Sequence, residues 1–293
     1  MRNEKQTTTT PLRPLKSLFR GVTRDWVLIV GTVVIVLIAA SALAADLLAT
    51  HEMGRVNLLA TNQPPSGTHW LGTDALGRDM YSQLLYGGRT SLYVAVVSAK
   101  LATVIGVVLG AIAGYLGRYV DAALMRFSEL VLAFPYLILV LILVSVVGAS
   151  VNNLVIVFAL TTWMGTFRIV RGEFMSLKHE PFVDAARTQG LSTARIIFRQ
   201  ILPNVASPIL VALSIGVATI VLAEAALSFL GLGVPVTTAT WGNLLAAAQS
   251  KEVLRNYWWI WVTPGLVISF FSIGVNLVAD GLRDVLDPQS AKQ

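Results

Sequence analysis

Six long apolar stretches constrain the fold of this chain more than any other feature of its sequence. Each approaches or exceeds the about 20 residues that a helix needs to cross the hydrocarbon core of a bilayer. Only 13% of the 293 residues are charged, whereas soluble domains contain about 25%. The sequence therefore predicts an all-α, polytopic membrane protein. Its six transmembrane helices are expected at about residues 26–45, 91–116, 120–147, 151–169, 205–230 and 258–279.

The distribution of lysine and arginine predicts how these helices are oriented. Cytoplasmic loops of membrane proteins collect both residue types. With the N-terminus inside, sixteen of the 22 Lys and Arg residues fall on the inner side and five on the outer side. Both termini are therefore expected in the cytoplasm, and the net charge of +6 needs no nucleic-acid partner to explain it.

The spans divide the chain into four parts. Residues 41–45 have the small side chains of a signal-peptidase site, but five more spans follow, so the first helix is expected to stay uncleaved. The predicted parts are a cytoplasmic tail at 1–25, a first helix with a long extracytoplasmic loop at 26–90, a five-helix core at 91–282, and a cytoplasmic tail at 283–293.

A polar segment of mixed charge, residues 180–204, separates the fourth and fifth spans and is called here the coupling segment. Pro181 suits a first helical turn, Gly190 can end a helix in the left-handed conformation, and Ser192 can cap the next helix. Ala185 and Ala186 would leave a smooth face for another protein. We therefore expect two short helices beneath the membrane, although a plain amphipathic surface helix is the alternative.

The coupling segment resembles the EAA loop of permease subunits from ATP-binding-cassette importers. In that pattern Glu-Ala-Ala is followed by three residues, Gly, nine residues, Ile, one residue and Leu-Pro. Here Asp184 replaces the Glu and Gln200 replaces the Ile. The resemblance implies that the contact with an ATPase is carried by Glu180, Asp184, Ala185, Ala186, Gly190, Leu191, Leu202 and Pro203. Four further segments are similar to the dipeptide-permease C type, from the peptide and nickel branch of these importers. They are residues 69–79, 227–233, 241–243 and 281–288.

This resemblance implies a type I importer in a prokaryotic cytoplasmic membrane. Such an importer pairs two related permeases with two cytoplasmic ATPases and an extracytoplasmic substrate-binding protein. The chain would form half of the path for di- or oligopeptides, while the partner ATPases use ATP and magnesium. A permease for nickel or metal chelates is the alternative within the branch. An ion-coupled secondary transporter acting alone is the alternative from another class, but it would need buried ion-binding groups in broken helices.

Several absences in the sequence support a non-catalytic subunit without a cofactor of its own. No Gly-x-x-x-x-Gly-Lys-Ser/Thr phosphate loop occurs, so the chain is not expected to bind ATP. There is no cysteine, and the three histidines, His51, His69 and His179, are scattered. No metal site is therefore expected, and no nucleophile–base pair suggests an enzyme.

Polar residues inside the spans and in the outer loops are further candidates. Charges at membrane depth are costly and usually face water or the bundle interior, so Lys100 and Glu224 are candidates for the translocation path. The alternative is a structural ion pair or a snorkelling lysine. Arg126 and Glu129 are expected to neutralise each other. The outer loops offer possible contacts for a binding protein at Trp70, Asp74 and Trp241, and close helix packing is expected at Gly106, Gly110 and Gly114.

Overall fold

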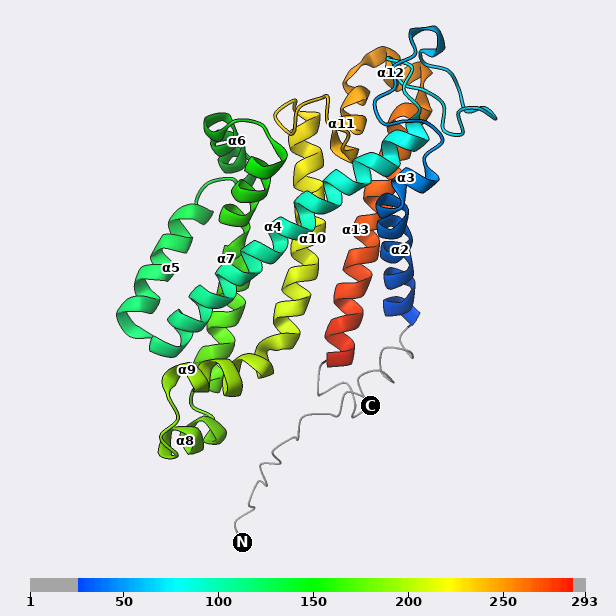
Figure 1. Ribbon diagram of the computed structural model, residues 1–293. Helices are drawn as coiled ribbons and strands as arrows, with labels where there is room; N and C mark the ends of the chain where they lie inside the picture. The colour runs from blue at the N-terminus through cyan, green and yellow to red at the C-terminus, as the bar shows by residue number, and fades with distance from the viewer. Residues whose placement is uncertain (1–25, 287–293) are drawn as a thin grey trace.

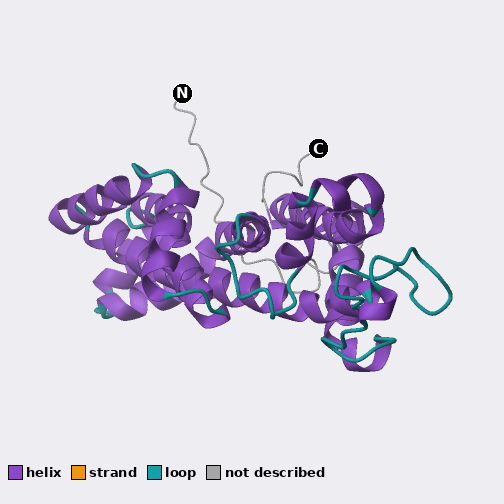
Figure 2. Cartoon of the chain, turned by 90° about the horizontal axis from the view of Figure 1, so that it is seen from above, coloured by secondary structure: helices purple, strands orange, loops and turns teal. Residues whose placement is uncertain are grey.

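Long helices run side by side between the two ends of an elongated bundle (Figures 1 and 2). The computed structural model describes residues 26–286, so the predicted tail 1–25 and most of the tail 283–293 lie outside the described residues. Within this range, five helical stretches are long and apolar enough to cross a membrane, and a bent pair of helices supplies a sixth. The all-α, six-span prediction is thereby confirmed. The spanning helices are α2 (Trp26–Leu43), α4 (Met80–Leu116), α5 (Arg118–Leu132) with α6 (Tyr136–Val147), α7 (Val151–Leu177), α10 (Ala206–Phe229) and α13 (Trp258–Leu286).

The third span is broken, which corrects the expectation of one continuous helix over residues 120–147. Helices α5 and α6 meet at an angle of 87°. The break lies at Pro135, which has no backbone N–H to donate and which disfavours helical geometry at the residue before it. The expected pair on α5 does form, with Arg126 Nη1 lying 2.9 Å from Glu129 Oε2. Both side chains are exposed, so this ion pair adds little stability.

Helix α4 begins eleven residues before the apolar stretch that predicted it. Asp79 caps it by accepting a hydrogen bond from the Ser82 N–H. Its polar second and third turns remain helical because Arg89 is satisfied by the carbonyl oxygens of Ala42 and Leu43 and by Asp46. With 37 residues, α4 is about 55 Å long, well beyond the about 30 Å of a hydrocarbon core. It therefore crosses the bundle diagonally (Figure 1).

Three glycines allow α4 and α7 to pack backbone to backbone. A Cβ atom added at Gly106 would lie 2.7 Å from the Trp163 carbonyl oxygen, and one added at Gly110 would lie 2.8 Å from the Phe167 carbonyl oxygen. At Gly114 the nearest atom would be the Phe174 Cβ, at 2.6 Å. None of these distances leaves room for a side chain, so the close packing predicted for this glycine string is confirmed.

The short elements gather at the two ends of the bundle (Figure 1). One end carries residues 49–79 and the helices α3, α11 and α12, while α8 lies at the opposite end. Helix α2 begins and α13 ends at the same end as α8. The remaining short elements are α3 (Ala45–Leu48), α8 (Pro181–Thr188), α9 (Thr193–Arg195), α11 (Trp241–Leu245), α12 (Lys251–Asn256), 3₁₀ turns at Leu58–Ala60, Leu202–Val205 and Ala246–Gln249, and a π-helical stretch at Ile196–Ile201.

Candidate functional site

The coupling segment folds as a helix, a glycine turn and a second helical stretch, as its sequence predicts. Pro181 lies in the first turn of α8, and Gly190 ends that region with a φ of 76°. Ser192 occupies the N-cap position of α9, but its side chain makes no capping hydrogen bond. The chain then winds more widely as a π-helix before Pro203, which cannot donate the hydrogen bond of a regular α-helix. The π-helical stretch is followed by the 3₁₀ turn Leu202–Val205, which leads directly into α10.

One face of the coupling segment is buried against the bundle. Val183 and Ala186 of α8 form a common apolar cluster with Val170 and Phe174 of α7, and Ile201 joins them from the π-helical stretch. Ala186 is only 4% exposed, which corrects the expectation that it offers surface to another protein. It lies one helical turn after Val183, so both side chains point to the inner face of α8. This cluster fixes α8 to the helices above it.

The opposite face of α8 is exposed and polar. Asp184 and Ala185 are exposed, and Arg187 Nη1 lies 3.1 Å from Asp184 Oδ1. The Arg187 guanidinium also lies over the ring of Tyr115, 5.6 Å from its centroid. Of the remaining candidates, Glu180, Gly190 and Pro203 are exposed, while Leu191 and Leu202 pack at the edge of the apolar cluster. Ala185 is thus the small residue at which a partner can approach the α8 backbone.

Polar contacts connect this end of α7 to α4 and α5. The Lys178 Nζ atom donates to the Gly114 carbonyl oxygen at 3.1 Å, in the last turn of α4. The Arg171 guanidinium forms a bidentate pair with the Asp121 carboxylate of α5, and its Nη2 atom lies 2.6 Å from Oδ2. Bidentate pairs of this kind are both strong and directional. The apolar cluster and these polar contacts therefore connect α8, through α7, to α4 and α5.

Glu224, a candidate for the translocation path, is buried within the chain. Its side chain is 1% exposed and accepts hydrogen bonds from the Ser228 hydroxyl at 2.8 Å and the Ser91 hydroxyl at 3.3 Å. The Ser91 oxygen in turn accepts a hydrogen bond from the Trp241 N–H. Glu224 thus joins α10, α4 and α11 in one polar network, an arrangement that favours the structural alternative for this residue.

We expect Glu224→Ala to lower the stability of the protein by about 2–4 kcal/mol, because it opens a cavity and leaves two buried hydroxyl groups without an acceptor. Thermal unfolding of the purified protein measures this effect. Glu129→Ala is the matched control, since the Glu129 side chain is 43% exposed and its ion pair contributes at most about 1 kcal/mol. Equal unfolding temperatures for the two variants would contradict the structural role.

Lys100, the other candidate for the path, lies on the exposed surface of α4. No described residue forms an ion pair with it. The exposed position is compatible with a path that a second subunit completes and equally with a lysine that snorkels along lipid. Its role stays a prediction, and uptake by a Lys100→Met variant measures it.

The three outer-loop candidates differ in how accessible they are. Trp70 is 55% exposed and packs on the Tyr81 ring at 4.9 Å. Asp74 is buried and accepts hydrogen bonds from Arg78 and the Leu76 N–H. Trp241 is 1% exposed and donates from Nε1 to the Leu84 carbonyl oxygen at 3.1 Å. The expectation of accessible side chains is therefore corrected for Asp74 and Trp241, which support these loops from within, and Trp70 is the exposed one of the three.

The end of the bundle opposite α8 also holds a cluster that the sequence did not predict. His51, His69 and Asp79 each offer a ligand atom, and these atoms all lie within 4.8 Å of one another. Burial alone would raise the pKa of the Asp79 carboxyl, but hydrogen bonds from Ser82, His69 and Thr50 outweigh it and hold that pKa below its usual value. The two histidines are 18 residues apart in an irregular loop, where no helical or strand period shows which side chains meet.

Together, the apolar bundle and its exposed polar element define a multi-pass membrane protein with a polar surface at one end of the bundle. The chain belongs to the family of binding-protein-dependent transport system inner membrane components, whose model matches residues 106–292. It is therefore a permease component of an ATP-binding-cassette importer, located in the inner membrane.

Curated relatives cover almost the whole chain. It is 39% identical over 262 residues to a putative peptide permease protein of Brucella suis biovar 1, covering 89% of this chain and 87% of the relative. It is 37% identical over 280 residues to the dipeptide transport system permease protein DppC of Alkalihalophilus pseudofirmus, covering 96% and 91%. The oligopeptide transport system permease protein OppC of Bacillus subtilis is 38% identical over 263 residues, with 90% and 86% covered.

A solved structure shares the fold. A chain of the MetNI methionine ABC transporter, crystallised in an inward-facing conformation, superposes with a TM-score of 0.58 at 16% sequence identity. The match covers 71% of this chain and 98% of that one.

Proposed function

We propose that this chain forms half of the translocation path of an ATP-driven importer of di- or oligopeptides. The observation that carries the proposal is the exposed Asp184–Ala185 face of α8, held on the bundle by a buried apolar cluster. Such an element can receive a displacement from a soluble subunit and pass it to α4 and α7. The names of the relatives, which include dipeptide and oligopeptide permeases, support peptides as the cargo.

The proposed assembly contains a second, related permease, two cytoplasmic ATPases and an extracytoplasmic substrate-binding protein. This chain is the non-catalytic subunit and does not itself bind ATP or the magnesium that accompanies it, which the ATPases use. Both termini lie in the cytoplasm together with α8, and residues 46–79 with α11 and α12 face the binding protein. The excess of Lys and Arg in the connections assigned to the α8 side supports this orientation.

The absence of cysteine from the chain permits a direct test by single-cysteine crosslinking. We expect Ala185→Cys to crosslink to an ATPase subunit of the purified complex, and to react with a membrane-impermeant maleimide only after the cells are permeabilised. Ala149→Cys is the control, because Ala149 is exposed in the turn between α6 and α7, at the other end of the bundle (Figure 1). It should react in intact cells and form no ATPase crosslink, and the reverse pattern would overturn the proposal.

The cargo is tested separately by uptake in cells that lack this gene. We expect the uptake of labelled di- and oligopeptides to fall in these cells and nickel uptake to stay unchanged. The opposite result would assign the chain to metal import.

A further inference from the structure

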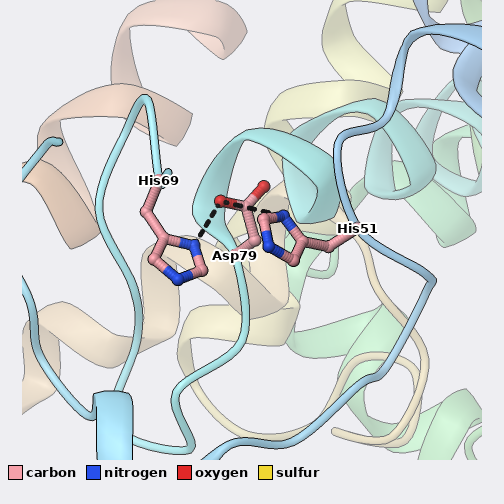
Figure 3. Close-up of side chains that lie close together, drawn as sticks. All are labelled: His51, His69 and Asp79. Atoms are coloured by element: carbon pink, nitrogen blue, oxygen red, sulfur yellow. Dashed lines mark hydrogen bonds and ion pairs between the residues drawn. The ribbon is translucent and has the colours of Figure 1, made fainter. Parts of the chain in front are cut away.

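Two of the three histidines meet at one carboxylate at the outer end of the bundle (Figure 3). The His69 Nδ1 atom lies 2.9 Å from Asp79 Oδ1, and the His51 Nδ1 atom lies 3.7 Å from the same oxygen. The two imidazole rings stack with their centroids 4.7 Å apart. Three potential ligand atoms therefore converge from the segment after α3, from the following loop and from the start of α4.

The second oxygen of Asp79 is fully engaged by the protein. Oδ2 accepts hydrogen bonds from the Ser82 N–H at 2.9 Å, the Ser82 hydroxyl at 2.7 Å and the Thr50 hydroxyl at 3.1 Å. These contacts orient the carboxylate and direct Oδ1 toward both histidines. Hydrogen-bonded ligands of this kind are typical of metal sites, in which surrounding groups fix the direction of each ligand.

The cluster is shielded on one side and open on the other. The Asp79 side chain is 1% exposed, the His69 side chain 13% and the His51 side chain 27%. An ion can therefore enter past His51, while the carboxylate lies away from bulk water. The site also lies close to a fixed element, because Asp79 caps the 37-residue helix α4.

We propose that His51, His69 and Asp79 bind a divalent transition-metal ion of the Zn²⁺ class, through both Nδ1 atoms and Oδ1. Zinc bonds of about 2.0–2.1 Å in a tetrahedral site place neighbouring ligand atoms about 3.3 Å apart. The observed separations from Oδ1, 2.9 and 3.7 Å, lie on either side of this value, and all three ligand atoms lie within 4.8 Å of one another, so side-chain adjustments would bring them to an ion. Two imidazoles with one carboxylate suit zinc better than calcium or magnesium, which prefer all-oxygen sites.

A bound metal ion would hold the loop between His51 and Asp79 against the start of α4. His51 and Asp79 are joined by 27 intervening residues that carry only one short 3₁₀ turn among the described elements. An ion that fixes both ends of this segment restricts its movement and stabilises the layer that we propose to face the binding protein. The inference does not depend on which solute the transporter carries.

Zinc binding to the full-length protein tests this inference. The chain is purified in detergent with an affinity tag that contains no histidine, treated with a chelator, and titrated with ZnCl₂ by isothermal calorimetry. We expect one Zn²⁺ per chain and a rise in the unfolding temperature on zinc addition. His51→Ala should weaken binding by about 100-fold or more, because even the loss of a group behind a metal ligand costs about 10–100-fold.

Two further variants make the result specific. His179→Ala is the matched control: His179 is exposed beside α8 at the other end of the bundle, so zinc affinity should not change. Asp79→Asn keeps a side chain that can cap α4 but removes the anionic ligand, so the protein should fold in chelator yet bind zinc weakly. If the wild type bound no stoichiometric zinc, or if His51→Ala left the zinc affinity unchanged, the proposal would be wrong. The cluster would then only hold the loop on α4 through hydrogen bonds.

Discussion

Gly110→Leu is expected to lower the stability of the protein by about 3 kcal/mol or more, the largest effect on folding that we predict. A Cβ atom at this position would already lie 2.8 Å from the Phe167 carbonyl oxygen and 2.9 Å from the Val170 Cβ. Neither atom belongs to the far end of a flexible side chain, so the α4 and α7 backbones must separate. Overpacking of a well-packed core typically costs about 1–3 kcal/mol, and separated backbones also lose contacts along the whole seam. Thermal unfolding in detergent and the yield of monodisperse protein measure the effect.

Gly172→Leu is the control for this prediction. Gly172 lies on α7, and a Cβ atom added there meets nothing within 4 Å. The same substitution should therefore leave the yield unchanged and the unfolding temperature close to that of the wild type. If the two leucine variants lost stability equally, the close packing of α4 against α7 would not explain the result. The loss would then reflect a general need for glycine in these helices, for backbone conformation or for membrane insertion.

Ala185→Trp is expected to reduce ATP-linked uptake more than tenfold while leaving the protein folded. Ala185 is exposed on α8, so a large side chain there does not enter the apolar cluster that contains Val183 and Ala186. In the proposed complex, however, the indole would hold the ATPase away from the α8 backbone. Central residues of an interface often contribute about 2 kcal/mol or more, and each 1.4 kcal/mol is a factor of ten in affinity. Uptake into proteoliposomes and the amount of ATPase retained by the purified permease measure the loss.

Two controls separate docking from folding. Ala149→Trp places the same bulk on an exposed alanine at the other end of the bundle and should retain the ATPase. Ala186→Trp enlarges the buried neighbour of Ala185 and should lower the unfolding temperature as well as uptake. Wild-type uptake by Ala185→Trp would show that the exposed face of α8 does not carry the interaction.

Much of this fold could be predicted from the sequence because hydrophobicity and a few special residues act locally. Apolar stretches of sufficient length predict the spans whatever their neighbours are. Pro181 and Gly190 place the turn of the coupling segment because they restrict or permit backbone angles at their own positions. The spacing of Gly106, Gly110 and Gly114 predicts a close helix contact for the same reason, although the partner helix could be identified only in three dimensions.

The remaining features depend on contacts between distant residues. Arg89 lies just before the apolar stretch that predicts the second span, and it would normally mark the start of that helix. Helix α4 nevertheless begins before Arg89, because the end of α2 supplies carbonyl oxygens that accept hydrogen bonds from its guanidinium. Ala185 and Ala186 look alike in the sequence, and only packing against α7 separates an exposed alanine from a buried one. Pro135 did give a local signal for the break between α5 and α6, and the apolar composition on both sides obscured it. The meeting of His51 and His69 had no local signal at all.

Because of its length, α4 connects the two ends of the bundle directly. This single unbroken rod starts beside the Asp79 carboxylate and ends at the carbonyl oxygen that Lys178 holds near α8. In the proposed complex, a protein that favours one tilt of α4 from outside would also alter how tightly a partner is bound from inside, and the same free energy would act in the reverse direction. Cargo delivery and nucleotide consumption would then be linked by one piece of backbone, with no relay of separate parts between them.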